Sequence, residues 1–192
     1  FDVDRAPSFG GSHEQVGLCT DRSAGLGSKT FGLCLCLIPA HDHPALTSNI
    51  LVTQGALNII QPRSARTDST AMVLLGGPSR HYDWLDKEIA HQGDTVVART
   101  PTHRWTICDS PRTPERTQAL LRSHQNYVHW SDEGPGRLAE QLPLANPIWV
   151  TEDSVSMVYE ALSTGAAVGI LGVARRRRSR VAGGIATLIA DG

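Results

Sequence analysis

Two loops of this chain carry the glycine, hydroxyl and charged groups from which proteins build anion sites. In the first, LLGGPSRHYDW (74–84), an apolar run meets a turn, and the candidate ligand-binding residues are Gly76, Gly77, Ser79 and Arg80. Glycine lets a backbone approach a ligand closely, helix-start N–H groups favour an anion, and arginine adds a charge-assisted bond to phosphate. A tight strand-to-helix turn with a surface arginine is the alternative. There is no GxGxxG or Walker pattern, so both interpretations stay open.

The second loop, VTEDSVSMVYEA (150–161), is expected to end a strand and begin a helix that Asp153 or Ser154 can cap. Its candidate ligand-binding residues are Asp153, Ser154, Ser156 and Glu160. Hydroxyl and N–H groups at Ser154 and Ser156 could meet a phosphate in the first helical turn. Glu160 lies four residues after Ser156, so the two share one helical face. A carboxylate there could accept two hydrogen bonds from a ribose diol. The alternative is a capped helix whose Glu160 is in solvent.

A third loop, SPRTPER (110–116), follows an expected strand and opens a helix. Thr113 is expected to cap that helix, because Pro114 fits the first helical position. Arg112 and Thr113 would then face the same edge of the sheet as the other two loops. Convergence of three such loops favours a ligand site more than any one of them does.

Two histidines are the candidates for acid–base catalysis. His41 lies in HDH (41–43), whose spacing occurs in metal sites, yet no Glu or Cys stands at a companion spacing. A polar loop is therefore expected there, and no metal site is predicted. His13 lies in the glycine-rich segment GGSHEQVGL (10–18). Either imidazole could act as an acid or a base if it faced a cleft.

Strands and helices alternate from residue 71 to residue 171, which predicts an α/β fold with a parallel sheet and helices on both faces. The expected strands cover 71–77, 105–109, 126–130, 147–152 and 167–171, and the expected helices cover 82–92, 113–123, 137–142 and 154–163. Two earlier strands are expected within 33–39 and 49–57, followed by a polar linker at 61–70. In such Rossmann-like, doubly wound sheets, ligands bind at the carboxyl ends of the strands.

Composition excludes several classes of protein. The 192 residues are 40% hydrophobic and 19% charged, so the chain can bury a core, and its net charge of −1 gives no indication of nucleic-acid binding. None of its four cysteines forms a CxxC pair, which suits a reducing cytosol. The opening FDVDRAP predicts no signal peptide, and no apolar run has the ~18 residues of a membrane span. A cytoplasmic location is expected.

A basic run, ARRRRSR (174–180), is a local exception to the near-neutral net charge of the chain. The arginines from Arg175 to Arg180 could contact an anionic membrane surface, which would place the protein at the inner face of a membrane. A solvated segment after the last strand is the alternative. Nucleic acid is not expected as a partner, because the aromatic residues of RNA-binding motifs are missing.

Four segments together resemble the mitochondrial-fission Elm family: HDHPALTSNILVTQGALN, LLGGPSRHYDW, SPRTPE and WVTEDSVSMVYEALSTGAAVGIL. The most specific is VTEDSVSMVYEA, and the segments follow the family's order over roughly residues 30–192. Bacterial members are often labelled predicted nucleoside-diphosphate-sugar epimerases. The family in turn resembles GT-B glycosyltransferases, which have two Rossmann-like domains facing across a cleft.

That resemblance implies a nucleotide-sugar donor of the UDP type as substrate, with no tightly bound cofactor. Gly76, Gly77 and Ser79 would flank its diphosphate, with Ser154 and Ser156 at the phosphate-binding helix start. Glu160 would match the ribose-binding glutamate. His13 would be the first-domain candidate near the acceptor.

The domain sizes depart from this pattern. The expected organisation is a shortened first-domain remnant at 1–67 and a Rossmann-like nucleotide-binding domain at 68–192. Exposed sheet edges left by the missing strands would favour a homo-oligomer.

Three functions follow from these observations. The leading hypothesis is a GT-B-like protein that binds a nucleotide sugar, as a glycosyltransferase near the inner membrane face. The second is a non-catalytic interaction module with a vestigial nucleotide site, since plant members of the family are thought to recruit a dynamin-related protein. The third is an epimerase, which would need a bound nicotinamide cofactor and the GxGxxG fingerprint that this sequence lacks.

Overall fold

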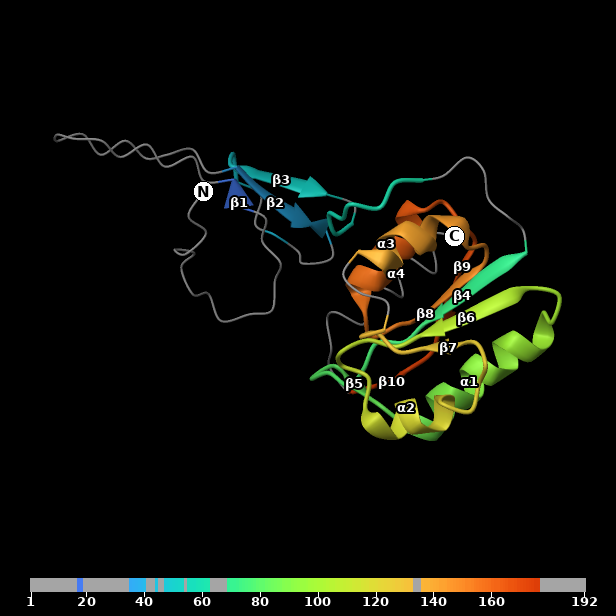
Figure 1. The fold of residues 1–192 in the computed structure, drawn as a ribbon. Helices are drawn as coiled ribbons and strands as arrows, with labels where there is room; N and C mark the ends of the chain where they lie inside the picture. Colours follow the sequence, from blue (N-terminus) through green and yellow to red (C-terminus); the bar gives the residue numbers. More distant parts are fainter. Residues whose placement is uncertain are drawn as a thin grey trace. The chain divides into compact units, whose positions relative to one another are not determined.

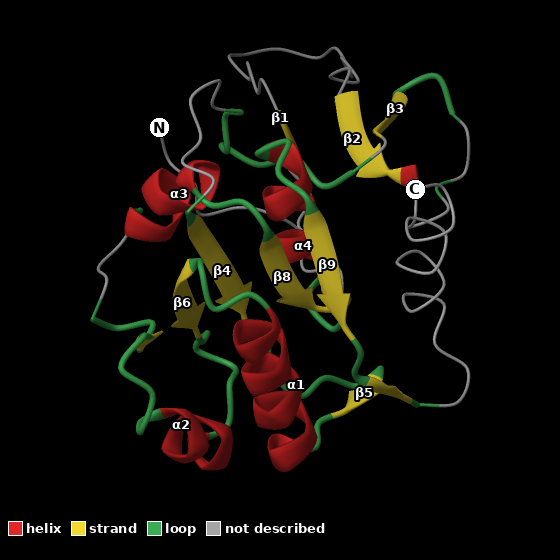
Figure 2. Ribbon diagram, turned by 90° about the vertical axis from the view of Figure 1, so that its right-hand side faces the viewer, coloured by secondary structure: helices red, strands yellow, loops and turns green. Residues whose placement is uncertain are grey.

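Residues 70–171 build a five-stranded sheet in which every neighbouring pair is parallel. Its strands, in spatial order, are β7 (Tyr127–Val128), β6 (Arg104–Cys108), β4 (Thr70–Leu74), β8 (Ile148–Thr151) and β9 (Val168–Leu171). Figure 2 shows the arrowheads of β4, β6, β8 and β9 pointing the same way. The parallel α/β sheet predicted from the alternating pattern is confirmed.

Helices cover both faces of this sheet (Figure 1). One face carries α1 (Asp86–Arg99) and α2 (Glu115–Leu121), and the other carries α3 (Arg137–Gln141), the 3-10 turn η2 (Leu142–Leu144) and α4 (Val155–Ser163). Successive side chains of β4 alternate between the two cores, as the pleat requires. Val73 packs into the core with Ile89, while Leu74 packs into the core with Val158. The sheet is therefore doubly wound.

The structure, a computed structural model, describes residues 17–18, 35–40, 44, 47–53, 55–62, 69–132 and 136–176. The chain divides into two units, Phe1–Gln54 and Gly55–Gly192. In the first unit, β1 (Gly17–Leu18) pairs antiparallel with β2 (Leu35–Pro39), and β2 pairs parallel with β3 (Ile50–Thr53). The domain boundary expected between residues 67 and 68 stays a prediction.

The first helix of the second unit differs from its predicted range of 82–92. Tyr82–Asp83 form a short strand, β5, that pairs antiparallel with β10 (Ala174–Arg175). The helix therefore begins only at Asp86, and it continues to Arg99. The apolar residues within 84–89 have the spacing of a helix. The two residues before them, however, pair with β10, and this long-range pairing prevents the helix from starting at residue 82.

Gly93 lies inside α1 and offers a stability test. A Cβ built at this position meets nothing within 4 Å, and glycine is a poor residue for a helix interior. Gly93→Ala should therefore raise the free energy of unfolding by about 0.5–1 kcal/mol, mainly by restricting the unfolded chain. Urea denaturation followed by circular dichroism measures this change. A lower stability would show that α1 has no room for the methyl group.

Candidate functional site

The strand order places a topological switch point between β4 and β8. From β4 the chain adds β6 and β7 on one side, and it then crosses to add β8 and β9 on the other. The connections after β4 and β8 therefore leave the sheet in opposite directions, and ligands of open α/β sheets bind in the crevice between them. The two loops that begin at this point contain Gly76–Gly77 and Thr151–Ser154.

The β4 and β8 loops are joined by direct hydrogen bonds. The N–H of Gly76 donates to Thr151 Oγ1 at 2.8 Å, and the N–H of Gly77 donates to Asp153 Oδ2 at 2.9 Å. A Cβ on Gly76 would overlap the Asp153 carboxylate, and one on Gly77 would overlap the backbone carbonyl of Arg112. Both glycines thus permit the close approach of the protein's own loops, and both N–H groups bind internal acceptors.

The loop between β6 and α2 completes this edge. Arg112 donates from Nη2 to Asp153 Oδ2 at 3.1 Å and from Nη1 to the Gly77 carbonyl at 3.3 Å. Its side chain is still 44% exposed, so part of the guanidinium faces solvent. The three loops expected to converge on one edge therefore do meet there.

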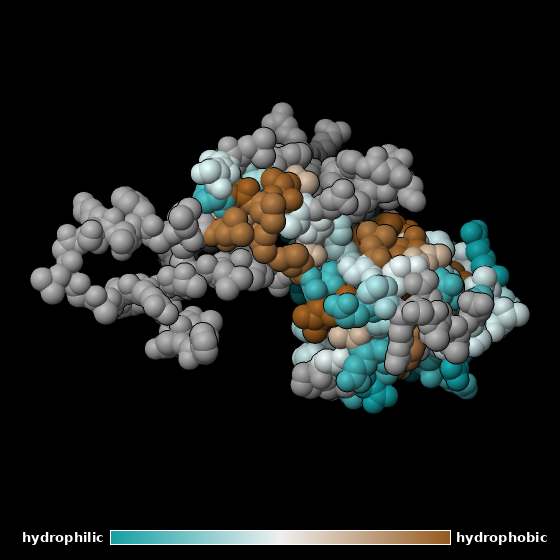
Figure 3. All heavy atoms as spheres, turned by 90° about the horizontal axis from the view of Figure 1, so that it is seen from above, coloured by the Kyte–Doolittle hydropathy of each residue, from teal (hydrophilic) through white to brown (hydrophobic). Residues whose placement is uncertain are grey.

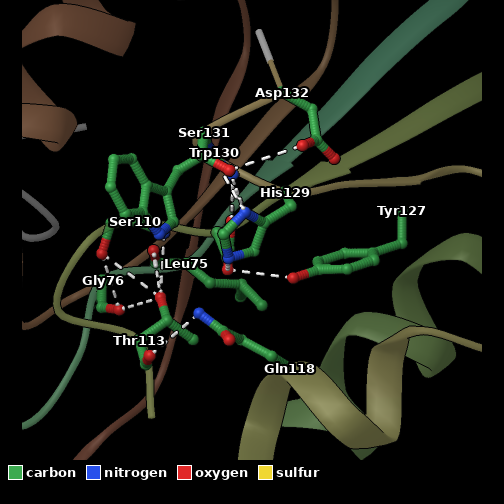
Figure 4. Close-up of polar contacts among 11 residues, drawn as sticks. Leu75, Gly76, Ser110, Thr113, Gln118, Tyr127, His129, Trp130, Ser131 and Asp132 are labelled. Carbon is green, nitrogen blue, oxygen red and sulfur yellow. Dashed lines mark hydrogen bonds and ion pairs between the residues drawn. The ribbon is translucent and has the colours of Figure 1, made fainter. Parts of the chain in front are cut away.

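Thr113 is buried and does not cap α2, so that prediction was wrong. Pro114 takes the N-cap position, while the Thr113 hydroxyl donates to the carbonyl of Gly76. Ser110 Oγ donates to the same carbonyl at 3.0 Å (Figure 4). A buried hydroxyl has more to gain from the Gly76 carbonyl than from a helix end that solvent can reach.

Asp153 is a charged group of the site that lies fully buried between the loops. Its side chain is 0% exposed, and its Oδ1 atom has no hydrogen-bond partner among the described residues. Burial raises the pKa of Asp153, although hydrogen bonds from Gly77 and Thr151 and the charge of Arg112 act in the opposite direction. Ser154 takes the N-cap position of α4 without a side-chain capping bond. Of the two caps predicted for this helix, Ser154 is therefore the N-cap residue by position, and Asp153 does not cap the helix.

The other residues predicted from the sequence to bind a ligand lie outside this cluster, either further along the loop after β4 or in and next to α4. Ser154 is buried at the start of α4, Ser156 is exposed one residue into the helix, and Glu160 is half-buried one turn further on. Ser79 Oγ accepts a hydrogen bond from the N–H of His81, and Arg80 donates to the His81 ring. The structure thus gives Ser79 and Arg80 local contacts.

The two histidines predicted as acid–base candidates, His13 and His41, lie outside the described residues. Their expected catalytic role stays a prediction.

A buried acid beside the site was missed by sequence reasoning. Asp109, with a fully buried side chain, accepts hydrogen bonds from Tyr127 Oη at 2.9 Å and from the N–H of Trp130 at 2.6 Å. Burial and the Asp109 carboxylate raise the pKa of Tyr127. Figure 4 shows the Tyr127 hydroxyl pointing toward the region of His129. The sequence signal that could have indicated Asp109 is the same as for the other loops: it is a polar residue directly after an apolar strand.

The first arginines of the basic run are engaged inside the second unit. Arg175 pairs with buried Glu152 at 2.7 Å, and Glu152 also accepts the N–H of Val173. Burial, together with the charge of Glu152, raises the pKa of Tyr82 to about 12. Arg176 pairs with exposed Asp83 at 2.6 Å.

The other arginines of the run, Arg177, Arg178 and Arg180, lie outside the described residues. Membrane contact through the whole run stays a prediction.

No described helix has the length and apolar character needed to cross a membrane. Among the same residues, no group of three or more His, Cys, Asp or Glu side chains is placed to hold a metal ion.

A comparison with models of known protein families gives a match. The family model described as Mitochondrial fission ELM1 matches residues 28–192. No curated protein matches the sequence.

Proposed function

The chain belongs to the mitochondrial fission ELM1 family, and on this premise we propose that its second unit binds a nucleoside-diphosphate sugar in a GT-B-like manner. The observation that carries the proposal is the meeting of the polar loops after β4, β6 and β8 at the switch point of the sheet. This is the place where open parallel sheets bind nucleotides. A neutral ligand would not require the guanidinium that these loops hold there.

Different groups serve different parts of the ligand. Arg112 supplies a half-exposed positive charge for the diphosphate. The first N–H groups of α4 and the exposed hydroxyl of Ser156 add further donors. Glu160 lies on the same face of α4 as Ser156, where its carboxylate would accept the hydroxyls of a ribose. The Gly76–Gly77 backbone sets the path of the loop.

Transfer of the sugar is the further step of this proposal. It requires a base that removes a proton from the acceptor, and the candidates are His13 and His41. Both belong to the first unit, so binding and transfer can be tested separately. Loss of the histidines should abolish turnover without affecting nucleotide affinity.

Glu160→Ala tests the nucleotide site directly. The variant should bind UDP about tenfold more weakly than the wild type, because a hydrogen bond to a charged group contributes about 1.5–3 kcal/mol. Isothermal titration calorimetry with UDP, GDP and CMP measures the affinities. Glu140→Ala removes an exposed glutamate from α3 and serves as the matched control. Equal UDP affinity in wild type and Glu160→Ala would place the ribose elsewhere.

An interaction module is the second candidate function, and one surface feature favours it. Ile59 is 81% exposed and lines a cavity of about 560 Å³ together with Pro62, Pro143 and Leu144. Figure 3 shows apolar residues in brown on the visible face of the molecule. Large exposed apolar side chains beside a cavity are typical of sites that bind other proteins. A folded sample that bound no nucleotide would favour this function.

A further inference from the structure

The Asp153 carboxylate occupies a position suited to a ligand anion. Two donors, the N–H of Gly77 and the guanidinium of Arg112, converge on its Oδ2 atom at 2.9 and 3.1 Å. Backbone N–H groups and arginine side chains bind carboxylate and phosphate oxygens in the same way. The protein therefore satisfies an anion-binding arrangement with its own side chain.

We propose that Asp153 is an intramolecular competitor of the ligand: its carboxylate holds Gly77 and Arg112 in the free protein, and a diphosphate binds by taking over these donors. This inference rests on the proposed function, since it names the group that regulates the same site. It assigns Asp153 a part in setting affinity, in place of the direct ligand contact and the helix cap expected from the sequence.

The cost of burying Asp153 supports this assignment. Its Oδ1 atom is buried and has no hydrogen-bond partner among the residues that the structure describes. A buried, unpaired acceptor loses its hydration without compensation, and the loss is largest for a charged group. The burial of this one oxygen is therefore uncompensated, and a ligand that satisfies Gly77 and Arg112 without this cost can replace the carboxylate.

The surrounding charges determine how the competition depends on pH. Arg112 faces Asp153 from the β6–α2 loop, and Tyr82 of β5 lies close enough for the two groups to interact. Glu152, its neighbour in sequence, is paired with Arg175 of β10. Because burial raises the pKa of Asp153, protonation begins at a higher pH than for an ordinary aspartate. Lowering the pH neutralises the competitor, and ligand affinity should rise.

Asp153→Asn is the decisive variant. The amide oxygen can still accept from Gly77 and Arg112, but it carries no charge and should be displaced more easily. We expect the variant to bind both UDP and inorganic pyrophosphate with an about tenfold lower Kd at pH 7.5, equivalent to about 1.4 kcal/mol. Its Kd should also change less than that of the wild type between pH 7.5 and pH 5.5. Asp83→Asn removes a charge from an exposed position and is the matched control.

The outcomes separate this inference from the proposed function. If wild type binds UDP and a folded Asp153→Asn binds it equally or more weakly, the competitor role is wrong and the nucleotide site stands. If Asp153→Asn gains affinity for pyrophosphate and neither protein binds a nucleotide, the competitor role stands and the nucleotide assignment fails. If neither protein binds either probe, both are wrong. Circular dichroism confirms that each variant is folded.

Discussion

Replacing Gly77 with alanine is expected to lower the free energy of unfolding by about 3 kcal/mol, the largest loss that overpacking commonly produces. A Cβ at this position would overlap the carbonyl oxygen and carbon of Arg112, which belong to the backbone and cannot rotate away. Relief requires the β4 and β6 loops to separate. That movement would also lengthen the hydrogen bond from Arg112 to the Gly77 carbonyl. Urea denaturation of wild type and variant gives the change in stability.

Gly93→Ala is the control for this experiment, because it makes the same chemical change with the opposite expected sign. The comparison separates the effect of crowding from the general effect of glycine on the unfolded chain. A Gly77→Ala protein as stable as the wild type would show that the two loops lie further apart than in the structure. The expected loss also means that glycine is sterically required at position 77 before any ligand binds.

The sheet of the second unit could be predicted because each strand is a short apolar run and each helix has its own local signals. The strand expected at 147–152 is β8 at Ile148–Thr151, and the helix expected at 154–163 is α4 at Val155–Ser163. Parallel strands buried on both faces are nearly continuous in apolar residues, so their positions are readable from the sequence. The meeting of the loops at one edge of the sheet then follows from the fold class.

The roles of single side chains in those loops could not be predicted in the same way. Thr113 and Asp153 stand at positions where a local pattern indicates a helix cap. Each instead bonds a group that follows β4: Thr113 the carbonyl of Gly76, and Asp153 the N–H of Gly77. These partners are 37 and 76 residues away in the chain. A local rule cannot choose between a helix end and a distant backbone group that burial makes more favourable.

Asp109 is another residue whose role depends on partners distant in the chain, here Tyr127 and Trp130. Its removal is the second prediction with a large expected effect on stability. Asp109→Ala is expected to lower the free energy of unfolding by about 3 kcal/mol, because it leaves the Tyr127 hydroxyl and the Trp130 N–H without their acceptor. Asp109→Asn keeps one acceptor oxygen and should lose less. Asp132→Ala removes an exposed acid from the segment after β7 that also contains Trp130, and it should change stability by no more than about 0.5 kcal/mol.

A double-mutant cycle with Tyr127→Phe identifies the cause of that loss. If the Asp109–Tyr127 hydrogen bond contributes, the double variant should be more stable than the sum of the single losses predicts, because the unpaired hydroxyl is gone. Additive losses would mean that Asp109 acts through Trp130 or through packing alone. The cycle also bears on the ligand site, since Asp109 directly precedes Ser110, which bonds the Gly76 carbonyl. A loss of nucleotide affinity in Asp109→Ala, restored in Asp109→Asn, would show that this buried acid positions the β6 loop.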